Sequence, residues 1–261
     1  MPASRMMVQG IDFGVVRAEF DLPGAFSAAA QAEAENAVDR FGAGRVDETG
    51  IAFVTIDPPG SMDLDQAVHI EKISTGYVVH YAIADVAAVV TPGGALDIET
   101  RKRGQTFYLP DGSVPLHPRA LSEGSASLLP DVVRPAALWR IELDAQAEPT
   151  SWQVRRALVK SVARLDYSTV QRDADAGTLH PSIAALPEFG RLRSVSAVAR
   201  GAIELKLPEQ SVVRDQPEDE SSARWRIELE PRTEADDWNA EVSLLTGMCA
   251  GRMMIDAGIG L

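Results

Sequence analysis

The most informative stretch of the sequence is Phe53-Val54-Thr55-Ile56-Asp57-Pro58-Pro59-Gly60-Ser61-Met62-Asp63-Leu64-Asp65-Gln66-Ala67. An apolar run ends at Asp57, a Pro-Pro-Gly-Ser turn follows, and two more aspartates alternate directly behind the turn. Because side chains alternate faces along an extended strand, we expect Asp63 and Asp65 to point the same way and Leu64 to point the other way. The turn can fold the chain back and bring Asp57 towards that pair.

Carboxylates crowded together in this way predict a cation site. They repel one another strongly unless a cation sits between them, and all-oxygen ligands suit Mg²⁺ or Mn²⁺. The pattern therefore favours a metal centre for phosphate chemistry. Two other interpretations are open at this point: a solvated Asp-rich turn, and a structural Ca²⁺ loop, although the spacing does not fit the helix-loop-helix calcium pattern.

The bulk composition is that of an ordinary globular protein. The 261 residues suit one large domain or two small ones, and 45% hydrophobic with 24% charged residues is typical of soluble chains. Cys249 is the single cysteine, which excludes an internal disulfide and, with four scattered histidines, gives no zinc pattern. We expect no signal peptide and no membrane-spanning segment, since no apolar run is long enough. These features predict a cytoplasmic protein.

The net charge of −13 argues against a protein that coats nucleic acid through a broad basic surface. The charge is nevertheless unevenly distributed. Residues 151–172 carry five basic residues against one acidic residue, whereas 209–237 carries ten carboxylates against four arginines. A solvated loop explains the acidic stretch. A local basic channel for a nucleic-acid strand is therefore compatible with the composition.

The residue periodicity predicts strands in the first part of the chain and helices towards its end. We expect strands at 51–57, 66–73, 77–85, 136–143, 152–162 and 223–230. We expect helices at 26–41, 94–107, 187–205 and 239–257. Asp166 is the expected N-cap of a further short helix through Val170, and 108–135 is expected to be irregular. This order indicates an α+β fold with a mixed, mainly antiparallel sheet and packed helices.

Three further stretches join the aspartate stretch in a recognisable pattern. They are His80-Tyr81-Ala82-Ile83-Ala84-Asp85-Val86, the segment from Tyr108 through Ser127 to Arg134, and the weaker Ala163-Arg164-Leu165-Asp166-Tyr167. In order and spacing, the four stretches together resemble the catalytic domain of the RNB family, which includes ribonuclease II and ribonuclease R. Any one of them alone would be a weak signal. The resemblance covers roughly residues 50–260.

The resemblance implies a metal-dependent hydrolytic exoribonuclease that degrades single-stranded RNA from the 3′ end to 5′-mononucleotides. The implied cofactor is Mg²⁺, with Mn²⁺ as an alternative. The implied catalytic and metal-binding residues are Asp57, Asp63, Asp65 and Gln66. The implied RNA-binding residues are Tyr108, Arg101, Arg103 and Arg134. The Tyr108 ring would stack on a terminal base and the arginines would touch phosphates; a tyrosine packed at a helix end and a solvated helix face are the alternatives. The sequence identifies no protein partner.

Two departures from the family pattern affect the expected activity. The better-known members carry a fourth aspartate where this chain has Gln66; an amide oxygen can still bind Mg²⁺, so we expect the site to tolerate the change. Family catalytic domains also continue past the equivalent of Leu261 into an arginine-containing motif. We therefore interpret 46–261 as the N-terminal portion of an RNB-type catalytic domain, preceded by a helical extension at 1–45. We expect exposed apolar side chains near Met253, Met254 and Ile255, and low stability of the isolated chain.

Three functional hypotheses are compatible with these patterns. The first is the exoribonuclease. The second is a non-catalytic RNA-binding or regulatory protein, or an inactive fragment of the enzyme, which Gln66 and the missing motif favour. The third is an unrelated Mg²⁺ phosphohydrolase, which explains the aspartates but leaves the segment from Tyr108 to Pro135 unexplained.

Overall fold

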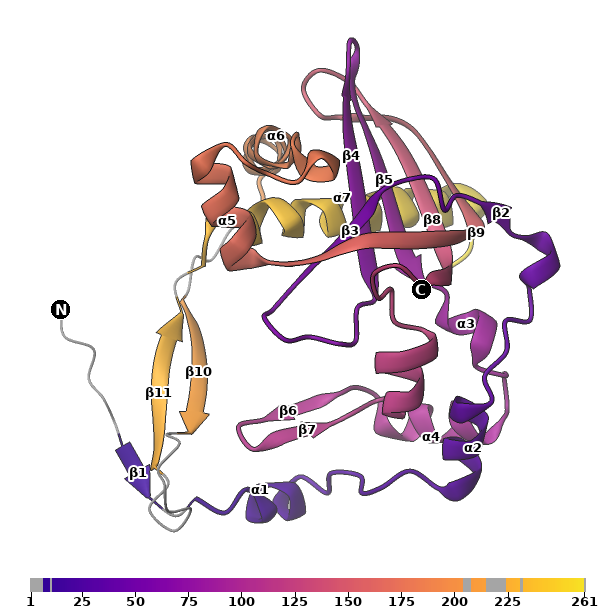
Figure 1. Ribbon diagram of the computed structural model, residues 1–261, viewed down its shortest axis with the longest axis vertical. Coiled ribbons are helices and arrows are strands. Elements are labelled where there is room, and N and C mark those ends of the chain that lie inside the picture. The colour runs from indigo at the N-terminus through magenta and orange to yellow at the C-terminus, as the bar shows by residue number, and fades with distance from the viewer. Residues whose placement is uncertain (1–6, 10, 204–207, 215–223, 231, 261) are drawn as a thin grey trace. The chain divides into compact units, whose positions relative to one another are not determined.

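The computed structural model describes residues 7–9, 11–203, 208–214, 224–230 and 232–260 (Figure 1). The chain forms two compact units, which are described separately. The larger unit comprises Ala37–Val89, Ala120–Glu204 and Thr233–Leu261, and the smaller unit comprises Met1–Asn36, Val90–Arg119 and Leu205–Arg232. The boundary expected after residue 45 stays a prediction.

A six-stranded sheet organises the larger unit. Its strands are β2 (Val46–Asp47), β3 (Phe53–Asp57), β4 (Gln66–Ile73), β5 (Gly76–Ala84), β8 (Val133–Leu143) and β9 (Pro149–Asp166). The spatial order is β2-β9-β3-β4-β5-β8, and β9 also pairs with β8, so the ladder returns on itself. Only β9 makes parallel pairs, with β2 and β3; the other pairs are antiparallel. The predicted α+β class with a mainly antiparallel sheet is confirmed.

The hairpin between β4 and β5 needs a glycine at its second strand. Gly76 has φ +148°, and a Cβ there would lie 2.1 Å from the carbonyl oxygen of Leu143 on β8. A side chain at this position would therefore collide with backbone that cannot move away without breaking the β5–β8 pairing. The turn itself consists of Ser74 and Thr75.

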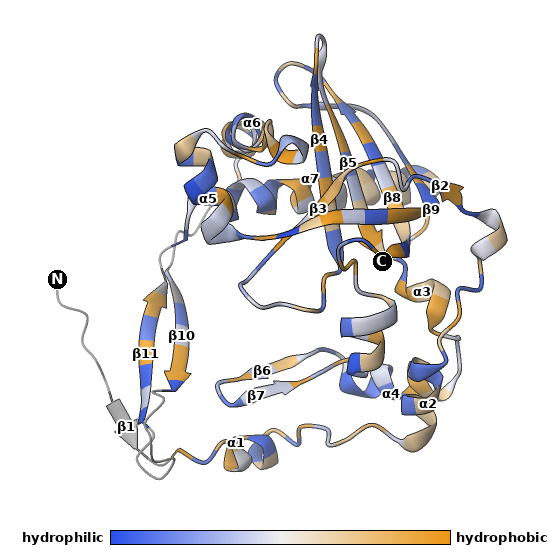
Figure 2. Cartoon of the chain, viewed as in Figure 1, coloured by the Kyte–Doolittle hydropathy of each residue, from blue (hydrophilic) through white to orange (hydrophobic). Residues whose placement is uncertain are grey.

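Helices α5 (Tyr167–Ala176), α6 (Leu186–Ala199) and α7 (Glu234–Ala257) pack against one face of this sheet (Figure 1). Val68 and Tyr81 from the strands share a buried cluster with Phe189 of α6 and Val242 of α7. The other face packs a second cluster around Phe53, Leu64 and Leu138. Figure 2 shows hydrophobic residues recurring along the strands of the sheet. Short helical turns complete the unit: η1 (Gly42–Gly44), α3 (Val86–Val89), the π-helical turn η2 (Ala120–Ser125) and η3 (Pro181–Ile183).

The smaller unit joins three segments that lie far apart in the chain. Its strands are β1 (Met7–Gln9), β6 (Phe107–Leu109), β7 (Gly112–Val114), β10 (Glu209–Arg214) and β11 (Arg224–Glu230), and its helices are α1 (Phe13–Glu19), α2 (Ala28–Glu35) and α4 (Ala95–Arg103). Glu33 of α2 accepts hydrogen bonds from the backbone N–H groups of Ala95 and Leu96, which caps the N-terminus of α4. Arg17 of α1 forms a two-pronged ion pair with Asp111 at the tip of the β6–β7 hairpin.

Several predicted boundaries are wrong for identifiable reasons. The helix expected at 26–41 ends at Glu35, because Asp39 and Arg40 are drawn into contacts with other elements: Asp39 binds Arg45, and the Arg40 backbone N–H binds the carbonyl of Ala88. The helix expected at 94–107 ends at Arg103, where Gly104 has φ +75° and stops it.

The segment 108–135 is less irregular than the sequence suggests. It holds most of the β6–β7 hairpin, the π-helical turn and the start of β8. Asp166 caps a helix as predicted, by accepting from the Thr169 N–H, but α5 continues to Ala176, where Gly177 in the left-handed region ends it. α7 begins five residues before the prediction, at Glu234, because Thr233 and Asp236 form a capping box.

Three further expectations concern the ends of two predicted elements, the exposed end of α7 and membrane-spanning helices. The helix expected at 187–205 ends earlier, because α6 ends at Ala199 with Arg200 as its C-cap. Residues 204–205 of that expected helix and residue 223 of the expected strand lie outside the described residues. The expected exposure near the end of α7 is confirmed: Met253, Met254 and Ile255 are 38%, 47% and 73% exposed. Within the described part of the chain, no helix combines the length and apolar character required to cross a membrane.

Candidate active site

The aspartate stretch forms a loop that joins the end of β3 to the start of β4. Asp57 is the last residue of β3, and Asp63 and Asp65 precede Gln66, the first residue of β4. Leu64 is fully buried while its two aspartate neighbours are exposed, so the predicted alternation holds even though these residues are not in a regular strand. The buried Leu64 anchors the loop in the second apolar cluster.

Polar contacts from the segment after the π-helical turn fix this loop. The Ser127 hydroxyl accepts from the Leu64 N–H at 3.1 Å and donates to the Met62 carbonyl at 2.6 Å. The Leu128 N–H donates to the Leu64 carbonyl at 2.7 Å. Hydrogen bonds from Ser127 and Leu128 therefore fix the backbone of Met62 and Leu64, on both sides of Asp63. They restrain the direction in which the Asp63 side chain can point.

Arg134 supports this arrangement in turn. Its guanidinium donates to the carbonyls of Ser127 and Gly124 at 2.9 Å each. Burial lowers the pKa of Arg134 below its ordinary value. The sequence predicts that Arg134 contacts RNA. In the structure its guanidinium instead binds the segment around Ser127, which in turn fixes the aspartate loop.

Desolvation and mutual repulsion shape the electrostatics of the carboxylates. Burial raises the pKa of Asp57 to about 6, and the negative charges of Asp65 and Asp63 add to the rise. Asp65 is exposed on the loop, but partial desolvation of its carboxyl group raises its pKa as well, and the charge of Asp63 adds to the rise, while hydrogen bonding to its own backbone and to the Gln66 side chain opposes it. The aspartates are therefore close enough to sense one another, as the sequence predicts.

Gln66 points towards the face that α7 covers. Its Oε1 accepts a short hydrogen bond from the Tyr81 hydroxyl and a second one from the Ser243 hydroxyl at 3.1 Å. The two hydroxyls also contact each other at 2.7 Å. Tyr81 comes from β5 and Ser243 from α7, so three elements meet at this amide.

A small cavity of about 80 Å³ lies beside Asp57. Its lining residues are Ile56, Asp57, Gln66, Val68, Tyr81, Tyr167 and Asn239. Asp63 and Asp65 do not line it, so the structure places Asp57 and Gln66 together on this side. Asn239 and Ser243 are four residues apart on α7 and therefore present their side chains to the same region.

The residues present fit a divalent cation in their donor chemistry. Among the residues that the structure describes, no three His, Cys, Asp or Glu side chains are already arranged to hold a metal ion. However, Oδ2 of Asp57 is buried and has no hydrogen-bond partner, which is costly for a carboxylate that nothing else satisfies. An oxygen ligand of this kind, with Asp63 and Asp65 nearby, suits Mg²⁺ or Mn²⁺.

The predicted RNA-binding residues of the smaller unit differ in exposure. Tyr108 on the β6–β7 hairpin is 78% exposed, which argues against packing at a helix end. The Arg101 side chain is 75% exposed and pairs with Asp97 one turn earlier. Arg103, in contrast, is buried over the Phe26 ring and donates to Glu99 and to backbone carbonyls. This burial argues against a phosphate contact by Arg103.

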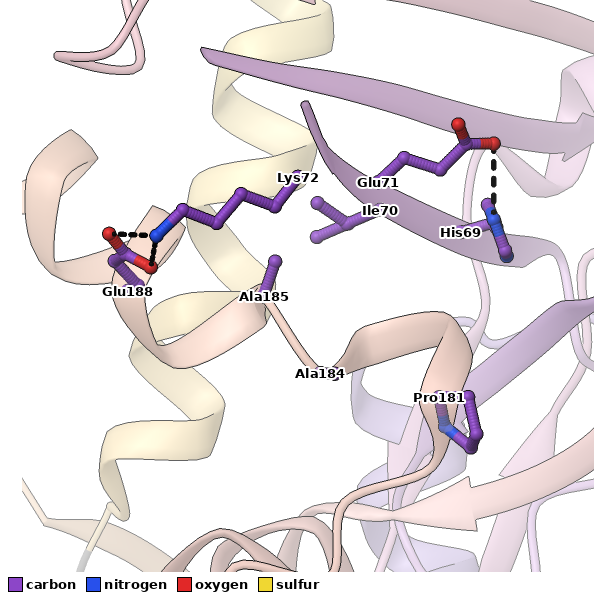
Figure 3. A pocket seen from close by; sticks show the side chains of 8 residues that line it. All are labelled: His69, Ile70, Glu71, Lys72, Pro181, Ala184, Ala185 and Glu188. Atoms are coloured by element: carbon purple, nitrogen blue, oxygen red, sulfur yellow. Dashed lines mark hydrogen bonds and ion pairs between the residues drawn. The ribbon is translucent and has the colours of Figure 1, made fainter. Parts of the chain in front are cut away.

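A second hollow, of about 420 Å³, lies elsewhere on the larger unit (Figure 3). It contains none of the predicted site residues. Its charged groups are paired with one another: Lys72 donates to Glu188, and Glu71 lies 3.4 Å from the Nε2 of His69. Burial lowers the pKa of the neighbouring His80. The charged side chains of this hollow therefore pair with one another, and they indicate no ligand.

Comparison with known proteins identifies the family. The RNB domain matches residues 45–260 of the chain. The chain belongs to the RNB domain family. Ribonuclease R of Mycoplasma pneumoniae is 36% identical over 181 residues, which are 66% of this chain and 25% of that protein. Ribonuclease R of Escherichia coli K12 is 32% identical over 224 residues, which are 81% of this chain and 27% of that protein. The RNB chain thus spans about a quarter of the length of these relatives.

The fold of this RNB chain matches a solved relative closely. RNase R of Mycoplasma genitalium, solved in complex with double-stranded RNA, aligns with a TM-score of 0.87 at 25% sequence identity. The alignment covers 95% of this chain and 46% of that one. The same protein has also been solved with ribose methylated single-stranded RNA.

Sequence reasoning missed the residues that support the aspartates from a distance. Ser127 and Arg134 lie within the recognised stretches of the sequence. Their spacing does not indicate that Ser127 holds the aspartate loop or that Arg134 holds the backbone of Ser127. Asn239 and Ser243 are spaced as neighbours on one face of a predicted helix, a signal that was present. Their proximity to Gln66 depends on how α7 packs, and periodicity does not reveal this.

The raised pKa of Asp57 predicts how this residue affects stability without metal. With a folded-state pKa near 6, the native protein binds more protons than the unfolded chain between about pH 4 and 6, so this group favours folding at low pH and opposes it as the pH rises through 6. In EDTA at pH 7.5, we expect Asp57→Asn to raise the free energy of unfolding by about 1–2 kcal/mol, allowing for solvent screening at a partly exposed group. The gain should fall to about a third of this value near pH 4.5 and vanish only below about pH 4.

Urea unfolding at both pH values measures this effect. Asp131→Asn, an isosteric change at an exposed position, is the control and should be neutral at both. An equal effect of Asp57→Asn at pH 4.5 and 7.5, or a destabilisation at pH 7.5, would contradict the role assigned to desolvation and repulsion.

Proposed function

We propose that this chain carries the aspartate centre of a metal-dependent exoribonuclease, which hydrolyses single-stranded RNA from the 3′ end and releases 5′-mononucleotides. The observation that carries the proposal is the buried, unpartnered Oδ2 of Asp57 beside Asp63 and Asp65. Membership of the RNB domain family supports it. So does the likeness to ribonuclease R proteins, although the chain spans only part of their length.

The aspartates would hold the cation in this function. Asp57 contributes its unpartnered oxygen, and Asp63 and Asp65 contribute carboxylates on a loop that Ser127 restrains. A divalent cation, Mg²⁺ or alternatively Mn²⁺, supplies positive charge that stabilises a phosphodiester under attack by water. The protein's own part is to keep these carboxylates crowded and oriented before RNA arrives.

The smaller unit would supply RNA contacts that do not depend on sequence. The exposed ring of Tyr108 offers a face on which a base can stack, and every base has such a face. The exposed Arg101 can touch a backbone phosphate. The Arg17–Asp111 ion pair holds the tip of the hairpin that carries Tyr108.

An RNA degradation assay tests the proposal directly. Single-stranded RNA labelled at its 5′ end is incubated with the chain and Mg²⁺ or Mn²⁺, alongside the same reaction in EDTA. The expected result is a ladder of labelled products that shortens from the 3′ end and is absent in EDTA. Internal cuts at scattered positions, or release of label as a mononucleotide at the first step, would contradict the proposed direction.

A non-catalytic RNA binder is the second candidate. It is favoured by Gln66 at the fourth position of the cluster and by the absence, among the described residues, of three side chains already arranged around a metal. This candidate predicts intact RNA in the assay together with measurable RNA binding in a gel shift.

Replacing Tyr108 with Ala tests the stacking role. Removing one base–aromatic stack costs about 1–3 kcal/mol, so we expect RNA affinity to fall about 5- to 150-fold, with a matching rise in KM and a smaller change in kcat. Tyr108→Phe keeps the ring and should retain most of the affinity. Fluorescence anisotropy with a labelled oligonucleotide measures both variants. Equal losses in the two variants would assign the effect to the hydroxyl and not to stacking.

A further inference from the structure

Residues 58–62, which join Asp57 to Asp63, lie in neither a strand nor a helix. Within this stretch the Ser61 N–H donates to the Pro58 carbonyl at 3.2 Å, and Gly60, with φ +86°, turns the chain. Most of the stretch is exposed, so packing does little to hold it in place. The separation of the two carboxylates therefore depends on contacts that reach the loop from other elements.

Arg164 of β9 supplies one of these contacts. Its Nη1 donates to the Ser61 carbonyl at 3.1 Å and also contacts the Met62 sulfur at 3.0 Å. The backbone of Arg164 is itself fixed, because it lies beside Thr55 in the parallel pairing of β9 with β3. Thr55 is two residues before Asp57 on β3. Arg164 thus ties the loop to the pair of strands that carries Asp57.

A second contact reaches the same loop from the opposite end. The Ser127 hydroxyl donates to the Met62 carbonyl at 2.6 Å, so Met62 is held through its carbonyl by Ser127 and through its sulfur by Arg164. Ser127 fixes the loop relative to the segment after the π-helical turn, whereas Arg164 fixes it relative to β3. Together the two contacts set the position of Asp63 relative to Asp57.

The Arg164 guanidinium contacts the loop without pairing with a carboxylate. In the part of the chain that the structure describes, Arg164 forms no ion pair. Arg155 and Arg156, earlier in β9, each pair with a carboxylate. The charge of Arg164 by itself would repel a divalent cation bound nearby and weaken its binding. Any contribution that Arg164 makes to cation binding must therefore come from where it places the loop.

We propose that Arg164 is a positioning residue of the aspartate centre: by holding Ser61 and Met62 against β9, it sets the position of Asp63 relative to Asp57 and strengthens the binding of a divalent cation. The inference rests on the proposed metal-dependent function and deepens it. It differs from a phosphate contact, the usual role of an exposed arginine beside RNA. Positioning and charge predict opposite effects on cation binding when the guanidinium is removed.

The first experiment follows the loop in the protein without metal. Amide hydrogen exchange in EDTA is read by mass spectrometry on the peptide that contains residues 58–64. We expect Arg164→Met to speed this exchange at least about threefold, because the loop loses a restraint. The control Arg172→Met removes an exposed guanidinium of α5 that pairs with Asp173 at 3.6 Å, and it should leave the exchange unchanged. Unchanged exchange in Arg164→Met would overturn the proposed restraint.

The second experiment measures Mn²⁺ binding by loss of the free-ion signal in electron paramagnetic resonance. We expect Arg164→Met to weaken binding about tenfold or more, as for loss of a group that orients a metal ligand. Arg164→Lys keeps a donor on a flexible stem and should restore part of the affinity. Arg172→Met should leave binding unchanged or slightly tighter. Unchanged or tighter binding in Arg164→Met is the effect of removing a positive charge alone, and it would overturn the proposal.

RNA binding separates positioning from a phosphate contact. In EDTA, fluorescence anisotropy with a labelled single-stranded oligonucleotide should give Arg164→Met and the unmodified chain affinities within about threefold of each other. A larger loss with a shallower salt dependence, together with unchanged Mn²⁺ binding, would replace the positioning role with a phosphate contact. If the unmodified chain binds no Mn²⁺, the proposed metal-dependent function fails, and the exchange measurement still decides whether Arg164 restrains the loop.

Discussion

Replacing Asp65 with Asn is expected to abolish RNA hydrolysis, by about 10³-fold or more in kcat. The substitution keeps the size and one oxygen of the side chain but removes its negative charge. After burial, the charge of Asp65 contributes most to the raised pKa of Asp57, more than the charge of Asp63 does, so Asp65 is central to the proposed cluster. Removing one preorganised group at the reacting charge commonly costs 10²–10³ in kcat, and a weakened cation site adds to that loss.

The expected loss should fall on kcat and not on RNA affinity. The RNA contacts proposed for Tyr108 and Arg101 are made by other parts of the chain, so Asp65→Asn should bind a single-stranded oligonucleotide within about threefold of the unmodified chain. Single-turnover assays and fluorescence anisotropy measure the two quantities separately. Asp131→Asn, the same substitution at an exposed position, should leave both unchanged.

The outcome also distinguishes the two candidate functions. An active chain whose Asp65→Asn variant is also active would remove Asp65 from the catalytic centre. A chain that binds RNA without cleaving it, with or without Asp65, would favour the non-catalytic RNA binder. In that second outcome the buried Oδ2 of Asp57 would need a different partner from a cation.

The sequence predicted what depends on local patterns and missed what depends on packing. Strand β4 has the predicted bounds, because alternation and turn residues are local properties. The alternation of Asp63, Leu64 and Asp65 also survives in the structure, since Leu64 is buried and the aspartates are not. The contacts of Ser127 with Met62 and Leu64 join residues more than sixty positions apart, and no local signal encodes them.

The arginines show the same distinction within a single helix. Arg101 and Arg103 are two residues apart and look equivalent in sequence, yet on a helix they face different sides. Arg101 points into solvent, whereas Arg103 packs on Phe26 and donates to the Gly24 carbonyl, a partner in the segment before α2. The position of that segment was beyond sequence reasoning, so the two side chains received the same predicted role.

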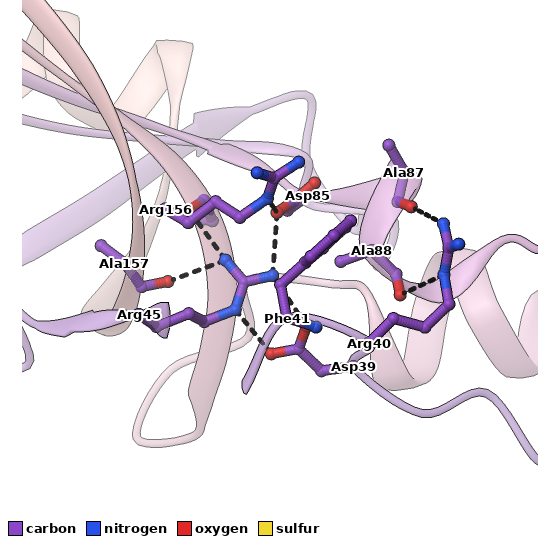
Figure 4. Close-up of polar contacts among 10 residues, drawn as sticks. Asp39, Arg40, Phe41, Arg45, Asp85, Ala87, Ala88, Arg156 and Ala157 are labelled. Carbon is purple, nitrogen blue, oxygen red and sulfur yellow. Dashed lines mark hydrogen bonds and ion pairs between the residues drawn. The ribbon is translucent and has the colours of Figure 1, made fainter. Parts of the chain in front are cut away.

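We expect the largest effect on stability from a substitution in the buried ion-pair network around Arg45 (Figure 4). The Arg45 side chain is fully buried and binds both Asp39, at 2.5 and 2.9 Å, and Asp85, at 2.8 Å. It also donates to the carbonyls of Ala136 and Ala157 on two strands. Arg156 pairs with Asp85 at 3.3 Å and stacks over the Phe41 ring at 3.8 Å. The network fastens the segment before β2 to the sheet.

Replacing Arg45 with Met is expected to lower the free energy of unfolding by about 3–5 kcal/mol at pH 7, because it leaves the largely buried Asp85 and the partly buried Asp39 without their shared partner. The hydrogen bond from Arg45 holds the pKa of Asp39 below its ordinary value. A carboxylate with a lowered pKa stabilises the fold above its unfolded-state pKa and loses that contribution as the pH falls through the folded one. The difference between Arg45→Met and the unmodified chain should therefore shrink below about pH 4.

Denaturant unfolding at pH 7 and pH 3.5 measures both parts of this expectation. Arg252→Met is the matched control: Arg252 pairs with Asp256 at 3.0 Å, but both side chains are more than half exposed, so water screens the pair and its loss should cost under about 1 kcal/mol. Similar losses in the two variants would mean that water reaches Arg45 and screens its charges as well. A loss at pH 3.5 as large as at pH 7 would assign the stabilisation to the packing of the Arg45 stem and its backbone contacts, and not to the carboxylates.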